Sequence, residues 1–292
     1  MEKLSKEEKA NIKAQKKAVK RERLKSRITE IDMLRGIAIL LMVMDHIFYD
    51  LGFFMESFFT DYPDKFAFTA KLYDAAQFYW FNSWRVGVRY FVVFLFLALT
   101  GISCSFSRSN LKRGVKLLIF GLALTLVTYL LGVYMEDKDA IILFNIIHSI
   151  ALSIICVWLI ELITSNKWVF LALGVIFTGV GAYIYFVNPG CKYVRFGSMP
   201  FFELLFKQMI GMVEVGADNA SFLFSGGQVF IGVFLGKLLY KERKSLIFKG
   251  DYKNNFLTFV GRNTLIIYLA HQVILPVIIG LILLIAGFKL AI

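Results

Sequence analysis

The sequence predicts an all-α fold: a polytopic integral membrane helix bundle with about seven transmembrane helices. The chain has 292 residues, of which 58% are hydrophobic and only 18% are charged, a composition typical of membrane proteins. Several apolar runs also approach the roughly 20 residues that a helix needs to cross a hydrocarbon layer about 30 Å thick. The seven predicted spans are 33–54, 86–106, 115–134, 141–163, 168–187, 222–240 and 264–288.

The basic residues predict how these spans are oriented. Eleven of the 33 Lys and Arg residues lie in the first 29 positions, which divides the chain into a basic cytoplasmic tail, 1–29, and a transmembrane domain, 30–292. The loops after the second, fourth and sixth spans are also basic, whereas the other loops hold at least as many acidic as basic residues. Because basic loops stay on the cytoplasmic side, we expect the N-terminus in and the C-terminus out.

The basic tail is consistent with either nucleic acid or a lipid surface as its partner. Lys and Arg beside a membrane span are typical of attraction to anionic lipid, so we expect the lipid bilayer as partner and no nucleic acid. No small-residue cleavage site follows the first apolar run, which indicates a retained anchor and a multi-pass protein of the cell membrane. Two of the three cysteines fall within spans, and their spacing predicts neither a disulfide nor a metal site.

The first span carries a stripe of ionisable residues, which are costly at the centre of a bilayer. On an ideal helix each residue turns by about 100°. Asp32, Arg35 and Asp50 then lie within about 40° of His46, whereas Asp45 lies about 100° away. We expect the stripe to face the interior of the bundle, where its members can satisfy one another.

Within this stripe, His46 and Asp50 are helical neighbours at positions i and i+4. A carboxylate that accepts a hydrogen bond from one imidazole nitrogen leaves the other nitrogen free as a base or nucleophile. This pattern makes His46 and Asp50 candidate catalytic residues. Asp32 and Arg35 are equally consistent with an ordinary ion pair at the membrane edge.

The other two histidines of the chain also lie inside predicted spans. His148 has Asn145 and Ser149 close to it on the same helical face, and His271 lies in the last span. A single buried histidine is more often a hydrogen-bonded core residue than a catalyst. Three of them in one bundle favour a catalytic interpretation.

Basic residues at the predicted cytoplasmic ends of the spans suggest a site for an anionic donor. Arg262 and Asn263 open the last span, where free backbone N–H groups and the helix dipole favour an anion. Arg113 and Lys237 lie at the same membrane face. The alternative is that these cations only reflect the positive-inside rule.

Four segments resemble a known family. They are "ITEIDMLRGIAILLMVMDHIFYDLGFF", "FLFLALTGISCSFSRSNLKRGVKLL", "ILFNIIHSIALSI" and "FVGRNTLIIYLAHQVIL". In this order they resemble the motifs of the bacterial heparan-alpha-glucosaminide N-acetyltransferase catalytic-domain family, a group of transmembrane acyltransferases. The resemblance spans about residues 28–285.

The resemblance implies a multispan enzyme that transfers an acyl group, usually acetyl from cytoplasmic acetyl-CoA, to a sugar amine or hydroxyl at the outer side. It makes residues 30–292 a transmembrane acyltransferase-like domain. The family's intramembrane histidine and aspartate match His46 and Asp50, its later histidines match His148 and His271, and its arginine matches Arg35. Relatives also carry proline and tryptophan at the entry to the sixth span, and both are missing here.

These residues imply a division of roles. His46, Asp50 and His148 form the expected catalytic set, in which His46 acts as general base or carries the acyl group as an acyl-imidazole. Asn145 and Ser149 are expected to stabilise the oxyanion. The expected donor-binding set, for acetyl-CoA as co-substrate without a metal, comprises Arg35, Arg113, Arg262, Asn263 and His271.

Two other classes of protein stay open at this stage, as does a homodimer. Buried Asp and His residues also mark proton-coupled transporters, although the sequence shows neither an inverted repeat nor matching broken spans. A catalytically inactive membrane sensor or assembly protein would tolerate replacement of His46. The leading interpretation is a membrane acyltransferase that acts on a cell-envelope saccharide.

Overall fold

The computed structural model describes residues 27–187, 190–216, 218–248, 250 and 252–291, together with positions 15, 22 and 24. The basic tail predicted for 1–29 therefore lies almost entirely outside the described residues. The predicted all-α class is confirmed, because the described residues form seven helices that are long and apolar enough to cross a membrane. These candidate spans are Thr29–Ser57, Ser83–Cys104, Asn110–Tyr134, Ile146–Ile163, Lys167–Val187, Phe222–Leu239 and Thr264–Ile285.

Capping side chains explain where the observed spans depart from the predicted ones. The fourth span, predicted from residue 141, begins only at Ile146 because the Asn145 side chain accepts a hydrogen bond from the backbone of Ile147 and ends the preceding extended segment. The third span begins at Asn110, before its apolar run, because the Ser109 side chain caps it. Apolar length alone does not reveal these boundaries.

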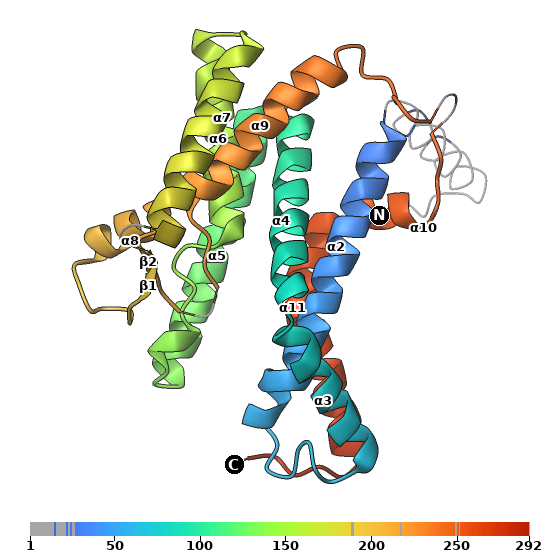
Figure 1. Cartoon of the computed structure of the whole chain (residues 1–292), viewed down its shortest axis with the longest axis vertical. Coiled ribbons are helices and arrows are strands. Elements are labelled where there is room, and N and C mark those ends of the chain that lie inside the picture. The colour runs from blue at the N-terminus through green and yellow to red at the C-terminus, as the bar shows by residue number, and fades with distance from the viewer. Residues whose placement is uncertain are drawn as a thin grey trace, which may run out of the picture. The chain divides into compact units, whose positions relative to one another are not determined.

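The chain forms two compact units, and the boundary between them falls within one helix (Figure 1). Unit 1 comprises Met1–Leu95 and Glu242–Ile292, and unit 2 comprises Phe96–Lys241. Helix α4 (Ser83–Cys104) contributes its first half to unit 1 and its second half to unit 2. Unit 2 lies wholly within residues 30–292, the transmembrane domain that the sequence predicts.

Unit 1 is built around the first and last spans. Its helices are α2 (Thr29–Tyr49), α3 (Ala67–Trp80), the first half of α4, α10 (Phe256–Arg262) and α11 (Thr264–Ile285). Helix α2 continues into a π-helical turn, and α3 folds back against this end of α2 (Figure 1). The amide of Gln77 on α3 donates to the Gly52 carbonyl of the π-turn at 2.6 Å, so α3 satisfies a backbone group that the wider turn leaves free.

Two glycines allow α10 to lie directly against α2. A Cβ atom at Gly261 on α10 would overlap the backbone carbonyl of Asp32 on α2. A Cβ at Gly36 on α2 would likewise overlap the carbonyl of Leu257. Because both obstacles are backbone atoms and not flexible side chains, this approach depends on glycine at both positions.

We expect Gly261→Ala to lower the free energy of unfolding by about 1–3 kcal/mol, the usual cost of overpacking. Gly87→Ala is the matched control, because a Cβ there meets nothing within 4 Å and alanine favours a helix. Thermal unfolding of the purified variants in detergent measures both. Equal midpoints for the two variants would show that α10 has room to shift.

Unit 2 packs around α9. Its helices are the second half of α4, α5 (Asn110–Tyr134), α6 (Ile146–Ile163), α7 (Lys167–Ala182), α8 (Phe201–Ile210) and α9 (Phe222–Leu239). Strand β1 (Lys192–Tyr193) pairs in parallel with β2 (Val213–Glu214). Val229, Phe230 and Val233 on α9 are at most 1% exposed, and α9 contacts both α6 and α7. Helix α9 is therefore the core element of this unit.

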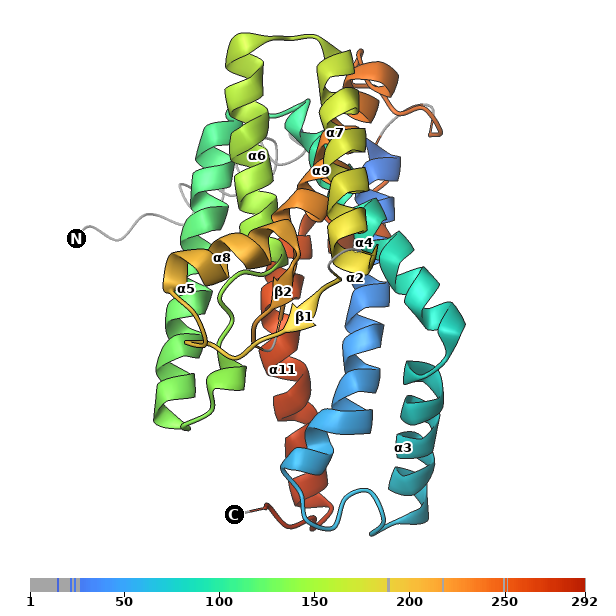
Figure 2. The same ribbon diagram turned by 60° about the vertical axis from the view of Figure 1, so that its left-hand side comes forward.

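Helix α8 runs across the spans of unit 2 and not along them (Figure 2). Its Leu204 and Gln208 are 1% exposed, whereas Phe202 and Phe206 on the other side are 81% and 62% exposed. A short helix with a buried face and exposed aromatic rings is typical of the membrane interface. The segment between the fifth and sixth spans, which the sequence leaves as a loop, therefore contains an interfacial element.

Candidate active site

Two histidines meet in unit 1, one from the first span and one from the last. The imidazole rings of His46 on α2 and His271 on α11 lie with centroids 4.6 Å apart and planes at 88°, an edge-to-face contact. His271 is only 5% exposed, whereas His46 is partly exposed. Of the two residues, His46 is therefore the more exposed.

Backbone carbonyls set the tautomer of both rings. Nδ1 of His46 lies 2.9 Å from the carbonyl oxygen of Met42, and Nδ1 of His271 lies 3.2 Å from that of Ile267. A carbonyl oxygen only accepts, so each Nδ1 carries a hydrogen and each neutral ring keeps its lone pair on Nε2. Nε2 of His271 is buried and has no hydrogen-bond partner among the described residues.

Asp50 lies near His46 but does not set its tautomer. The Asp50 side chain is buried and interacts electrostatically with His46. Among the described residues no hydrogen bond joins the two side chains, and Nδ1 of His46 is paired with the Met42 carbonyl instead. Asp50 is therefore placed to stabilise a positive imidazolium through its charge.

Asp45 lies outside the polar stripe of the first span and forms an ion pair with a residue of another helix. The guanidinium of Arg85 on α4 donates two hydrogen bonds to its carboxylate, both at 2.7 Å, and the hydroxyl of Tyr79 donates a third at 3.0 Å. The guanidinium carbon also lies 3.4 Å from the ring centroid of Trp80. Asp45 is thus part of a buried ion pair that joins three helices of unit 1, and this pair offsets the cost of placing it inside a span.

Three arginines gather around one carboxylate at the start of α2. Asp32 accepts from Arg27 at 2.7 and 2.8 Å and from Arg35 at 3.4 Å. It also accepts from the hydroxyl of Tyr252 at 2.9 Å, and Arg262 donates to that hydroxyl at 2.8 Å. Among the described residues, these contacts bring three guanidinium groups to one carboxylate and to the phenol that is hydrogen-bonded to it.

The Asp32 carboxylate also shifts the pKa values of groups outside the spans. Its hydrogen bond to Arg27 raises the pKa of that guanidinium. Burial and the same carboxylate raise the pKa of the Tyr252 phenol, although nearby hydrogen bonds oppose the shift. Near neutral pH the Tyr252 phenol therefore stays protonated and the Arg27 guanidinium stays charged.

The third histidine belongs to unit 2 and takes part in a helix cap. Nδ1 of His148 lies 3.0 Å from the side-chain oxygen of Asn145, and Nε2 lies 3.3 Å from the hydroxyl of Thr125. The Asn145 amide donates to Asp218 at 3.0 Å, and the Ser149 hydroxyl lies 3.5 Å from a backbone carbonyl. The structure does bring Asn145, His148 and Ser149 together at the start of α6. Their side chains are hydrogen-bonded to other groups of the protein there.

Two cations expected near a phosphate also lie in unit 2, and both have protein partners. Arg113 donates to the backbone carbonyl of Ser103 at 3.2 Å. The ammonium of Lys237 lies 2.9 Å from the carboxylate of Glu161. Arg35 and Arg262, by contrast, belong to the arginine cluster of unit 1, and His271 contacts His46.

These features define a polytopic membrane protein whose first and last spans hold two contacting imidazoles, with a cluster of guanidinium groups at the start of the first span. Residues 27–273 match the family model described as heparan-alpha-glucosaminide N-acetyltransferase, catalytic, and the chain belongs to this family. The family implies acetyltransferase activity, and the match confirms the resemblance found in the sequence motifs. No curated protein and no solved structure matches the chain.

Sequence reasoning missed Arg85, Arg27 and Tyr252. The signal for Arg85 was the unexplained Asp45, because a carboxylate inside a span needs a cationic partner. Tyr252 had no comparable signal, because it lies in a polar loop whose path over α2 depends on the fold.

Proposed function

We propose that this protein moves an acyl group, acetyl in the first instance, from cytoplasmic acyl-CoA to an amine or hydroxyl of a cell-envelope saccharide at the outer side of the cell membrane. The observation that carries the proposal is the pair His46 and His271. Each ring has Nδ1 occupied by a backbone carbonyl, and His46 is accessible. An accessible, unprotonated Nε2 suits base or nucleophilic catalysis.

Two routes of transfer are consistent with this arrangement. In the direct route, Nε2 of His46 takes the proton of the acceptor amine or hydroxyl while that atom attacks the thioester carbon. The CoA thiolate leaves and receives the proton from the imidazolium. In the other route, Nε2 of His46 attacks the thioester carbon, the CoA thiolate leaves, and the acyl group stays on the imidazole. The acceptor amine or hydroxyl then attacks the acyl carbon, Nε2 leaves and takes the acceptor's proton, and the imidazolium returns this proton to the thiolate.

Asp50 and His271 have supporting roles in either route. The charge of Asp50 favours the imidazolium that forms on His46 during proton transfer. The His271 ring touches the His46 ring. When His46 is an imidazolium, a second positive charge on His271 is unfavourable because two like charges in contact repel. We propose that His271 acts here, beside His46, in addition to the donor-binding role that the sequence suggested.

The arginine cluster of unit 1 is the proposed site for the phosphates of the donor. Guanidinium groups bind phosphate oxygens through paired hydrogen bonds, and Arg27, Arg35 and Arg262 supply three of them around Asp32. Asn263 follows Arg262 directly at the start of α11. Arg113, which lies in unit 2, stays a prediction of the sequence as a donor-binding residue.

We propose that the oxyanion is stabilised by Asn145, Ser149 or His148. Their present hydrogen bonds to protein groups restrict this role. Each group now binds a protein partner, so a reacting carbonyl must compete with Asp218, Thr125 or a backbone group for it. A change at any of the three is therefore expected to alter the start of α6 as well as the rate.

The test is acyl transfer by purified protein in detergent or nanodiscs, with radiolabelled acetyl-CoA and a panel of amino sugars and envelope glycans. We expect label on at least one saccharide, with release of CoA. We also expect Arg262→Gln to raise the KM for acetyl-CoA by about tenfold, the effect of losing one charge-assisted hydrogen bond. Lys244→Gln is the matched control, because Lys244 is an exposed cation of the same loop region.

Two results would overturn this proposal. Folded protein that neither binds nor consumes acetyl-CoA would remove the donor assignment. Equal KM values for the Arg262 and Lys244 variants would remove the arginine cluster from the donor site.

A further inference from the structure

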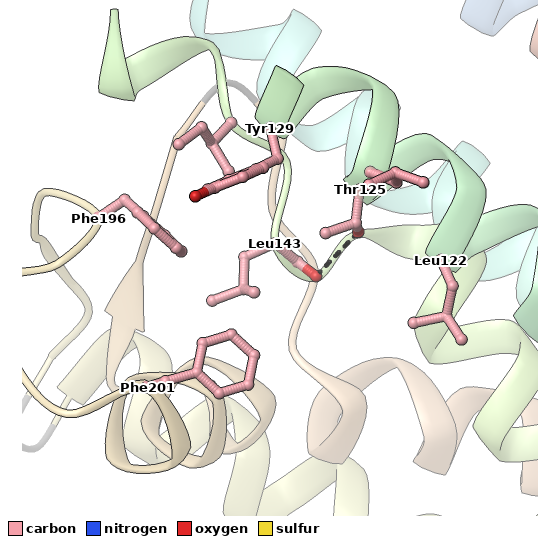
Figure 3. Close-up of a pocket in the computed structure, with 8 residues that line it drawn as sticks. Leu122, Thr125, Tyr129, Leu143, Phe196 and Phe201 are labelled. Carbon is pink, nitrogen blue, oxygen red and sulfur yellow. Dashed lines mark hydrogen bonds between the residues drawn. The ribbon is translucent and has the colours of Figure 1, made fainter. Parts of the chain in front are cut away.

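An apolar groove lies along α5 in unit 2, and the proposed catalytic roles do not use it. It encloses about 270 Å³ and is lined by Leu122, Thr125, Leu126, Tyr129, Ile141, Leu143, Phe196 and Phe201. In Figure 3 the rings of Tyr129, Phe196 and Phe201 surround the hollow with Leu143, and they come from three different segments of the chain. One water molecule takes up roughly 30 Å³ in the liquid, so the groove has room for roughly nine groups of that size.

The groove opens to the side that a bilayer covers. Its floor is buried, with Ile141 and Leu143 at 2% and 5% exposure, whereas its edges Leu122 and Leu126 are 56% and 58% exposed. These edges are continuous with the exposed apolar face of α5, a candidate membrane span. Whatever fills the groove therefore comes from the hydrocarbon phase.

The depth of the groove places it in one leaflet. At 1.5 Å per residue, Thr125 lies about 14 Å from the end of α5 at Tyr134, and Tyr129 lies about 7 Å from it. The positive-inside pattern makes this the outer end of α5. A chain in the groove would thus point its head toward the outer surface.

Asp139 and Tyr193 lie a few residues along the chain from the lining residues Ile141 and Phe196, and we take them as the outer rim of the groove, where they suit a saccharide. The phenol of Tyr193 donates to Asp139 at 2.7 Å, and the Tyr193 ring is 53% exposed. An exposed ring beside a carboxylate can stack on a sugar and accept hydrogen bonds from its hydroxyl or amino groups. In the described rim, the three cations Lys138, Lys192 and Arg195 are offset by the three acidic residues of 136–139, so no excess positive charge attracts a phosphate.

We propose that this groove binds the hydrocarbon chain of a membrane glycolipid and presents its sugar head at the Tyr193–Asp139 rim. The acceptor is then a lipid-borne saccharide that enters sideways from the outer leaflet. This inference rests on the proposed function for the fate of the sugar, but binding itself does not require acyl transfer.

The test uses the full-length protein in nanodiscs and two photoactivatable probes with the same diazirine-bearing acyl chain. One probe is a monoglucosyl diacylglycerol, and the other is phosphatidylglycerol. Mass spectrometry of the irradiated protein maps the adducts. Leu126→Trp fills the groove, and Leu130→Trp is the matched control, because both leucines lie on α5 and are 58% exposed but only Leu126 lines the groove.

We expect adducts of the glucosyl probe to concentrate in 122–129 and 196–201, and to fall at least fivefold in Leu126→Trp but not in Leu130→Trp. Adducts spread evenly along α5, or equal in the two variants, would overturn the groove as a binding site. Equal labelling by phosphatidylglycerol would overturn the glycolipid as its occupant. Specific labelling of a protein that fails to transfer acetyl groups would leave the binding site standing while the proposed function falls.

Discussion

His46→Ala is expected to lower the rate of acyl transfer by a factor of about 10²–10⁴, the usual contribution of a general base. His46 is the accessible ring of the pair, and its Nδ1 is held by the Met42 carbonyl, so the reactive Nε2 has no obvious replacement. The measurement is the turnover of acetyl-CoA with the best acceptor. Acid-labile label on the wild-type protein, absent from the variant, would identify the acyl-imidazole route.

Three controls separate chemistry from folding in this experiment. The variant should keep its thermal midpoint and its affinity for acetyl-CoA, and added imidazole should restore part of the lost rate. Asp50→Asn should cost only about tenfold, because Asp50 acts on His46 through its charge and not through a hydrogen bond. Turnover by a folded His46→Ala within threefold of wild type would remove His46 from the reaction and favour another catalytic centre.

Arg85→Met is expected to lower the free energy of unfolding by about 3–5 kcal/mol, as does the removal of one partner from a buried ion pair. The Arg85 and Asp45 side chains are 5% and 18% exposed, and the change leaves a carboxylate inside a span without its cation. It also removes the contact of the guanidinium with Trp80. Reversible unfolding in mixed micelles measures the effect.

Two further variants test whether the unpaired carboxylate causes this loss of stability. Asp45→Asn combined with Arg85→Met should be more stable than Arg85→Met alone, because the unpaired charge is gone. Lys244→Met, which breaks an ion pair with Glu242 whose side chains are 78% and 75% exposed, should cost less than about 1 kcal/mol. A loss in Arg85→Met no larger than that of Lys244→Met would mean that Asp45 finds water or another partner.

The membrane architecture of this protein could be predicted from the sequence because it depends on a property of contiguous residues. A run of about 20 apolar residues must span a bilayer as a helix whatever surrounds it, and all seven predicted spans are present. The polar stripe of the first span follows from helical periodicity in the same way. The family could be recognised because its motifs are stretches of contiguous residues, which can be read along the chain without the fold.

Only the tertiary structure decided which groups meet. Asp45 and Arg85 are 40 residues apart in the chain, and Asp32 and Tyr252 are 220 apart. The contact between His46 and His271 joins the first span to the last. Local periodicity says which face a side chain occupies but not which helix covers that face. It also does not reveal backbone partners: Nδ1 of His46 is paired with the Met42 carbonyl, and the expected hydrogen bond to Asp50 is not seen among the described residues.

The polar connecting segments show the same limit. Helices α3, α8 and α10 are too short or too polar to be predicted as spans. They form because spans already in place offer them a surface. For α3 this surface is the opened turn at Gly52, and for α10 it is the glycine-lined face of α2. The sequence by itself therefore determined the number of spans and the residue types available for catalysis. The packing of backbone against backbone decided which of those residues share a site, because glycine contacts and buried ion pairs act between segments that are distant in the chain.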